Sequence, residues 1–246
     1  MAARFHWWIA QQFLEETIMA TYAIISEGIS ENLSIHAIVE KMSHEDTYFA
    51  DIQPRTDMNH SHAVQEGPGG WTEVLSHCNT EVFKQALQSN DYLIIQVDTD
   101  RCDEPLCGIK KTDENNQARP DADVYNDIIE RMLQDVDKEF YETNKHRIIF
   151  AICFEEIECW FLPLFYSDKR ACATTGCIGK LNQELSKEKG GYYIPEKGKN
   201  GANARCTYQF ILKKIKRKDI PQIAQYNLGF QRFVEQLSTI DKGAEE

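Results

Sequence analysis

Three apolar runs in this chain each end abruptly in acidic residues, and no other feature of the sequence constrains the fold as strongly. The clearest run is Leu93–Val97, which has Gln96 as its only polar residue and leads directly into Asp98 and Asp100. A run of this length and β-branched content favours a buried strand. Ligands in open α/β sheets bind at the carboxyl ends of the strands. Asp-x-Asp is nevertheless a common sequence, so this motif alone slightly favours an ordinary acidic loop.

The same pattern occurs twice more in the chain. Tyr22–Ser26 leads into Glu27, and Arg147–Phe154 leads into three glutamates between 155 and 158. Amphipathic helical patterns separate the runs, so together they predict a parallel sheet with right-handed crossovers. Independent surface acids have no reason to fall at the end of every strand. We therefore expect an α/β protein with a mostly parallel sheet flanked by helices, and with carboxylates gathered at one edge.

Acids at such an edge indicate a metal ion. Strand side chains alternate in direction, so Asp98 and Asp100 are expected to project to the same side. Glu27 and one of the glutamates at 155–158 join them, and no basic partner is expected nearby. Carboxylates this close repel each other unless a cation lies between them. Mg²⁺ prefers such oxygen ligands, and two ions about 4 Å apart could polarise a phosphodiester and activate a water.

The rest of the pattern predicts helices and loops. A helix follows Ser30, and further helices are expected at 72–88, 121–142, 205–217 and 220–237, with a weak strand at 47–52 and a helix-like run at 159–165. Residues 53–70 form a polar loop, in which His60 and His62 are more typical of surface histidines than of ligands. We divide the chain into an N-terminal extension (1–20), an α/β domain (21–166) and a basic, mainly helical C-terminal region (167–246).

The composition is that of an ordinary globular protein, with 42% hydrophobic and 27% charged residues in a chain of 246. No apolar run reaches the roughly 18 residues of a membrane span. The N-terminal extension contains Trp7 and Trp8, but polar residues interrupt it and no small-residue cleavage site follows, so a signal peptide is not expected. These features predict a cytoplasmic protein.

The net charge of −12 is unevenly distributed. Between Lys180 and Lys218, eleven Lys or Arg residues accompany only three acids, so this segment carries +8 and the remainder carries −20. A basic face of this kind could track the phosphates of a nucleic acid. A solvated helix face with a lysine-rich loop explains the segment about as well. The candidate nucleic-acid contacts are Lys180, Lys197, Lys199, Arg205, Lys213 and Lys214.

Eight cysteines raise the question of disulfides or zinc. Cys102 and Cys107 are separated by four residues, as are Cys172 and Cys177, which is wider than a C-x2-C zinc knuckle. Cys159 lies beside an apolar segment, as buried free thiols do. We expect reduced, mostly buried cysteines, as is usual in the cytosol.

The order strand–Glu–Gly–helix, then strand–Asp-x-Asp, resembles the TOPRIM domain of topoisomerases, DnaG-type primases and OLD-family nucleases. The matching segments are Ile24–Gly28 and Ile94–Asp100. Glu155–Trp160 is similar to small stand-alone TOPRIM-like proteins of bacteria, often encoded beside AAA or ABC-type ATPases in antiphage systems. The resemblance covers roughly residues 20–165. The chain departs from the pattern in Arg101–Asp103, where small residues usually follow, and it shows no catalytic tyrosine, primase zinc module or polymerase domain.

Carried over to this chain, the resemblance implies a nuclease that depends on Mg²⁺ or Mn²⁺. Glu27 would be a metal ligand or an acid–base group, and Asp98 and Asp100 would hold Mg²⁺. Glu155 or Glu158 would complete a second metal site. OLD-type enzymes also place a basic residue near the scissile phosphate. The candidates for that role are Lys180, Lys197 and Lys199, of which Lys199 is taken as the catalytic one.

Two functions of different classes follow from this. The first is a metal-dependent endonuclease that cuts DNA or RNA, including tRNA, as the toxic effector of a defence system with an AAA or ABC-type ATPase partner. The second is a non-catalytic TOPRIM-like regulatory or adaptor subunit of an ATPase complex. A homo-oligomer is left open in both. A phosphoacceptor or nucleotide-binding protein is weaker, because Gly67–Gly70 follows no clear strand and lacks the Lys-Ser/Thr of a Walker loop.

Overall fold

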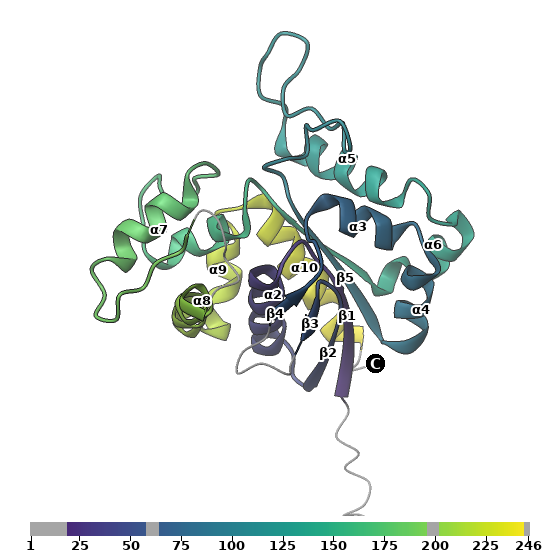
Figure 1. Ribbon diagram of the computed structural model, residues 1–246, viewed down its shortest axis with the longest axis horizontal. Coiled ribbons are helices and arrows are strands. Elements are labelled where there is room, and N and C mark those ends of the chain that lie inside the picture. Colours follow the sequence, from purple (N-terminus) through teal and green to yellow (C-terminus); the bar gives the residue numbers. More distant parts are fainter. Residues whose placement is uncertain (1–18, 58–63, 196–201, 244–246) are drawn as a thin grey trace, which may run out of the picture.

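The computed structural model describes residues 19–57, 64–195 and 202–243. Its centre is a sheet of four parallel strands in the order β2-β1-β5-β6 (Figure 1). The strands are β1 (Met19–Ile25), β2 (Asp46–Gln53), β5 (Tyr92–Asp98) and β6 (Ile148–Cys153). The prediction of an α/β fold with a parallel sheet flanked by helices is therefore confirmed.

Helices cover both faces of the sheet (Figure 1). One face carries α3 (Trp71–Cys78), α4 (Glu81–Ser89), α5 (Asp121–Leu133) and α6 (Lys138–Asn144). The other face carries α2 (Ile29–Met42) and α10 (Leu228–Gly243), and α8 (Ala202–Lys214) packs against α2 within the same apolar cluster. The remaining elements are β3 (Arg55–Asp57), β4 (Val64–Glu66), η1 (Lys145–Arg147), η2 (Ile157–Leu164), α7 (Cys177–Leu185), η3 (Arg217–Asp219) and α9 (Ile220–Ala224).

The two faces are filled by alternate side chains of the same strands. Ile24 and Ile94 point to the layer that contains α2, whereas their neighbours Ile25 and Ile95 point to the layer that contains α3 and α4. All four side chains are fully buried. Because both faces are covered, β6 is a continuous apolar run and β5 is apolar from Leu93 to Val97 except for Gln96, so neither strand alternates between apolar and polar residues.

Two of the expected helices are each broken by a polar cap. The helix expected over 72–88 is α3 and α4, because the Thr80 side chain accepts a hydrogen bond from Val82 N (3.3 Å) and starts a new helix. The helix expected over 121–142 is α5 and α6, and Asp137 accepts from Phe140 N (2.7 Å) at the second start. Short polar side chains bind nearby backbone groups and favour caps over helix interiors.

Other boundaries also differ from expectation. The run at 159–165 belongs to the 3-10 helix η2, which contains Pro163. The last helix is divided into α9 and α10, α7 was not expected, and the loop over 53–70 contains the antiparallel β3–β4 pair. Of these, α7, α9, β3 and β4 are short elements, for which periodicity carries little signal.

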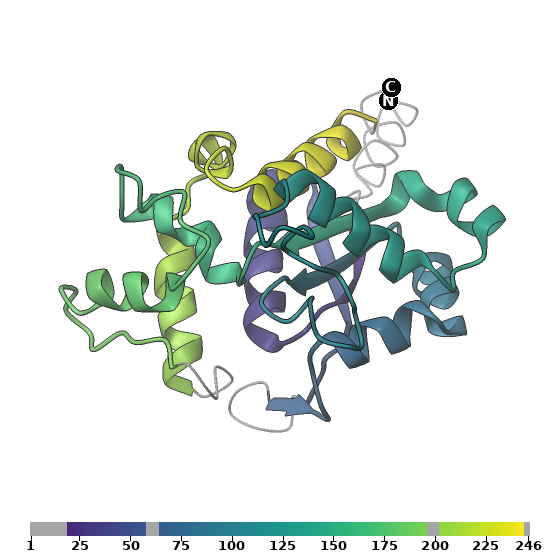
Figure 2. The ribbon, with the colours of Figure 1, turned by 90° about the horizontal axis from the view of Figure 1, so that it is seen from above.

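The C-terminal helices share a core with the sheet. Tyr208 of α8 and both Phe230 and Phe233 of α10 belong to the apolar cluster that contains Ile24. Figure 2 shows α10 beside α2, with α7 and α8 on the side of α2 away from α3 and α4. A separate C-terminal region beginning at 167 stays a prediction. Within the described ranges, no helix is long and apolar enough to cross a membrane.

Gly229, near the start of α10, allows this helix to approach the edge strand β6. A Cβ atom on Gly229 would lie 1.8 Å from the carbonyl oxygen of Ile152. We expect Gly229→Ala to lower the free energy of unfolding by about 2–3 kcal/mol, as overpacking does. Gly179→Ala in α7 is the matched control, because its Cβ would meet nothing within 4 Å and alanine favours a helix over glycine by about 1 kcal/mol. Urea titration measures the free energy of unfolding of both variants. Equal changes in the two would contradict the close packing of α10 on β6.

The expectation that all cysteines are reduced is wrong for one pair. Cys159 in η2 and Cys177 at the start of α7 form a disulfide, with their Cα atoms 5.1 Å apart. Packing of α7 against η2 brings the two together, and their spacing in the sequence does not indicate it. The six other cysteines are free, and four of them are buried as expected.

The disulfide joins residues 18 positions apart. In the chain-entropy description, closing a loop of this size stabilises the folded state by about 3 kcal/mol. We expect the Cys159→Ser, Cys177→Ser double variant to unfold at a lower temperature than the oxidised protein. Dithiothreitol should lower the melting temperature of the parent chain and leave that of the double variant unchanged. A parent melting curve that does not respond to the reductant would show that the bond does not contribute.

Candidate metal centre

The order of the strands places Glu27 and Asp98 at a special point of the sheet. The chain runs from β1 to β2 on one side of β1 and later places β5 on the other side. The helix after β1 covers one face and the helix after β5 covers the other. The crevice between two such connections is a topological switch point, where open α/β proteins bind ligands. Glu27 follows β1 and Asp98 ends β5, so both lie beside this crevice.

Glu27 and Asp98 are in direct contact. The backbone N–H of Asp98 donates to Glu27 Oε1 (2.6 Å). Gln96 joins the pair from within the sheet, because its Oε1 accepts from Glu27 N (3.1 Å) and its Nε2 donates to Asp98 Oδ1 (2.8 Å). β5 ends at Asp98, so strand alternation does not set the direction of Asp100 as expected. Asp98 is buried and Asp100 is exposed.

The surroundings of Glu27 disfavour its negative charge. Burial raises the pKa of the Glu27 carboxyl to about 8, against the lowering effect of the hydrogen bond from Asp98. The charges of Glu31 and Asp100 raise this pKa further, and Arg101 lowers it. Glu31 is itself buried in the first turn of α2, where it accepts from Ser30 Oγ (2.8 Å). A nearby cation would relieve the cost of ionising Glu27.

Glu155 lies at the end of β6, next to Asp100. Its backbone is left-handed, with φ of 64°, which a non-glycine residue adopts only when its surroundings hold it there. Thr99 Oγ1 accepts from Glu155 N (2.8 Å), and Asp100 N donates to Glu155 O (3.0 Å). Lys111 Nζ lies 3.6 Å from Glu155 Oε2 and donates to Thr99 O (3.0 Å). The expectation that the acidic edge has no basic partner is therefore wrong.

Glu158 lies in the interior beneath this edge. It is fully buried in η2, and its carboxylate accepts a hydrogen bond from the hydroxyl of Tyr208 in α8. Burial raises the pKa of the Cys153 thiol, and Asp98, Glu31 and Glu158 all add to that rise. These acids therefore lie around one buried region. That Glu155 or Glu158 completes a second metal site stays a prediction.

The basic residues expected to contact nucleic acid lie mainly on the C-terminal helices. Lys214 pairs with Glu188 (2.8 Å), and Lys180 on α7 donates to Gly176 O (3.4 Å). Arg205 and Lys213 lie on α8 with Lys214. Lys197 and Lys199 lie outside the described residues. Two other basic side chains in the described part of the chain do reach the acidic edge. Lys111 pairs with Glu155, and the charge of Arg101 lowers the pKa of Glu27.

The glycine-rich end of the polar loop packs against Glu27. Gly70 N donates to Glu27 O (3.0 Å), and a Cβ atom on Gly69 would lie 2.2 Å from the same oxygen. The indole Nε1 of Trp71 donates to Asp98 O (2.8 Å). The loop before α3 thus reaches the site at its C-terminal end. His60 and His62, earlier in this loop, lie outside the described residues.

The donor set suits a hard divalent cation. Glu27, Asp98 and Asp100 offer carboxylate oxygens, which Mg²⁺ and Mn²⁺ prefer. In the part of the chain that the structure describes, no group of three or more His, Cys, Asp or Glu side chains is arranged to hold a metal ion. Mg²⁺ usually keeps several waters and takes only one or two carboxylates from a protein. Glu27 and Asp98 can supply these one or two carboxylate ligands.

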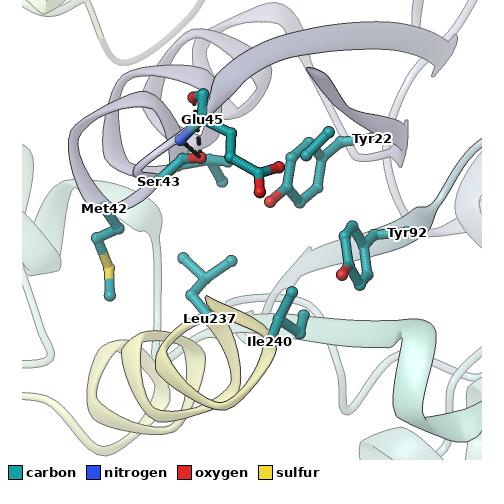
Figure 3. Close-up of a pocket in the computed structure, with 9 residues that line it drawn as sticks. Tyr22, Met42, Ser43, Glu45, Tyr92, Leu237 and Ile240 are labelled. Carbon is teal, nitrogen blue, oxygen red and sulfur yellow. Dashed lines mark hydrogen bonds between the residues drawn. The ribbon is translucent and has the colours of Figure 1, made fainter. Parts of the chain in front are cut away.

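Two cavities lie toward the other end of the strands. Figure 3 shows one between Tyr22, Tyr92 and Ile240, at the amino ends of β1 and β5. Its volume of about 30 Å³ admits little more than water. A groove of about 620 Å³ lies between α5, β6 and α10, where Tyr125 and Arg232 line it. Neither cavity is lined by the predicted carboxylates.

Sequence reasoning missed two residues at this site. Glu31 lies about one helical turn beyond Glu27, and its position in the first turn of an expected helix was a usable signal. Lys111 lies in an irregular segment, where no periodicity predicts what it contacts.

A comparison of this chain with protein-family models, curated proteins and solved structures found no match.

Proposed function

We propose that this chain is a metal-dependent endonuclease that hydrolyses phosphodiester bonds in DNA or RNA, tRNA included. The observation that supports it most is the contact at the switch point of a parallel sheet, where the backbone N–H of Asp98 donates to the Glu27 carboxylate (2.6 Å). Two acidic residues that meet here, with Asp100 and Glu155 following the same strand ends, suit a cation that binds phosphate. Mg²⁺ or Mn²⁺ is the proposed cofactor.

Each side chain then has a distinct part. A bound Mg²⁺ would supply Lewis acidity and a more acidic water. Asp98 is held by Gln96 and is the best-fixed candidate ligand. Without a metal, Glu27 has a pKa of about 8, and a bound cation would favour its ionised form, so Glu27 is the candidate that would exchange a proton as the metal binds. Lys111 is placed to offset the charge of a phosphate near Glu155.

The proposal is tested with the full chain and a panel of single- and double-stranded DNA, single-stranded RNA and tRNA, with Mg²⁺ or Mn²⁺. We expect cleavage of at least one substrate, its loss with EDTA, and its loss in Glu27→Ala. Lys111→Met should weaken cleavage with little effect on folding. Absence of cleavage with every substrate, also in the presence of a partner ATPase, would refute the proposal.

A non-catalytic adaptor is the second candidate. It is favoured by the lack of a three-residue metal group among the described residues and by the high pKa of Glu27, which lets the site stay partly neutral without a metal. Mn²⁺ titration separates the two functions, because an adaptor needs no metal. Either way we propose a cytoplasmic protein that works with an AAA or ABC-type ATPase in antiphage defence, which co-purification of the two proteins tests.

A further inference from the structure

Gln96 is a polar side chain in the centre of an apolar sheet. It is fully buried, and it interrupts a strand whose other residues from Leu93 to Val97 are aliphatic. Burying an amide is unfavourable unless its hydrogen bonds are made. An aliphatic side chain would fill the same space at lower cost, so the amide itself requires an explanation.

The amide group connects the ends of three strands. Its Oε1 accepts from Glu27 N after β1 (3.1 Å), and its Nε2 donates to Asp98 Oδ1 in β5 (2.8 Å) and to Cys153 Sγ in β6 (3.7 Å). The backbone N–H of Glu27 can only donate, which fixes the oxygen of the amide on that side. Its nitrogen must then face the Asp98 carboxylate.

We propose that Gln96 is the positioning residue of the acidic edge, holding the Asp98 carboxylate and the Glu27 turn in one fixed arrangement. The inference rests on the proposed function, because it concerns how the same carboxylates are presented to a cation. A neutral amide both accepts from Glu27 N and donates to Asp98 Oδ1, which neither an ionised carboxylate nor an aliphatic side chain can do. Partners of this kind orient metal-binding side chains, and their loss weakens metal binding about 10–100-fold.

Two substitutions remove the amide and keep the approximate volume of the side chain. Gln96→Leu and Gln96→Met both lose the hydrogen bonds to Glu27 N and Asp98 Oδ1. The two differ in shape, so an effect common to both comes from the lost bonds. Gln236→Met is the matched control, because Gln236 also bonds backbone groups of β6, accepting from Phe150 N (2.9 Å) and donating to Phe150 O (3.1 Å), near the amino end of the strand.

The first readout is Mn²⁺ affinity, measured by calorimetry on the full chain at pH 7.5. We expect binding to weaken at least about tenfold in both Gln96 variants and to stay unchanged in Gln236→Met, with melting curves confirming that each variant is folded. Folded Gln96 variants that bind Mn²⁺ like the parent chain would overturn the proposal.

The second readout needs no metal. The Asp98 amide donates to Glu27 at a short distance of 2.6 Å, so its proton resonance should move when Gln96 is replaced and stay in place in Gln236→Met. A parent chain that binds no Mn²⁺, combined with a shifted Asp98 amide, would reject the proposed function while supporting the positioning role. An Asp98 amide that does not move in either folded Gln96 variant would reject the positioning role.

Discussion

Glu27→Gln is expected to lower the proposed nuclease activity by at least about 100-fold while raising thermal stability. The amide oxygen of glutamine can still accept the hydrogen bond from Asp98 N that Glu27 accepts at 2.6 Å, so the turn should be preserved. The charge that would bind a cation is removed. Loss of a group that only orients a metal ligand weakens activity or binding about 10–100-fold, so loss of a ligand itself should reach at least the upper end of that range. Cleavage assays and melting curves on the same preparations measure the two effects.

The gain in stability should depend on pH. Because the pKa of Glu27 is about 8 in the folded chain and about 4.3 in an unfolded one, the folded state keeps a proton that the unfolded state releases between these values. Stability in EDTA therefore falls as pH rises through that window. Glutamine does not titrate, so the advantage of the variant should grow from pH 5 to pH 8 and then level off. A variant less stable than the parent at pH 8 would contradict this assignment.

Gly69→Ala is expected to damage the site without removing any charged group. Its Cβ atom would lie 2.2 Å from Glu27 O and 2.9 Å from Gln65 Nε2, so either the loop or the Glu27 turn must move. We expect the free energy of unfolding to fall by about 2–3 kcal/mol. A displacement of about 1 Å of the reacting groups can cost about 100-fold in rate.

Gly179→Ala again serves as the control for the substitution itself, because its Cβ would occupy open space. Denaturant titration and cleavage should both change in Gly69→Ala, and neither should worsen in Gly179→Ala. Full activity in a Gly69→Ala protein would show that the loop does not support Glu27.

The sequence predicted the sheet because the strands are buried on both faces. Leu93–Val97 is apolar except for Gln96, and Ile148–Cys153 is a continuous apolar run. Such runs arise when helices cover both sides of a sheet. The acidic residues at the strand ends could also be predicted, because each of these apolar runs stops where an acidic residue follows. Parallel pairing then places Asp98 beside Cys153 in register, so the meeting of these ends follows from the fold class.

The parts that could not be predicted depend on contacts between distant segments. Gln96 was visible as a polar interruption, but its partners come from two other strands. The Cys159–Cys177 disulfide depends on how α7 packs. Lys111 reaches Glu155 from an irregular loop. The helix breaks at Thr80 and Asp137 could not be predicted, because apolar residues keep their helical spacing in the sequence on both sides of each cap.

Titration of Mn²⁺ into the metal-free protein at pH 8 tests the central claim most directly, with Asp98→Asn as the comparison. Asparagine keeps the size of Asp98 and removes its negative charge, while the backbone N–H of residue 98 can still donate to Glu27. The account predicts saturable binding by the parent chain, proton release from Glu27 on binding, and affinity at least about tenfold weaker in Asp98→Asn. No binding by the parent chain, or equal binding by the variant, would contradict it.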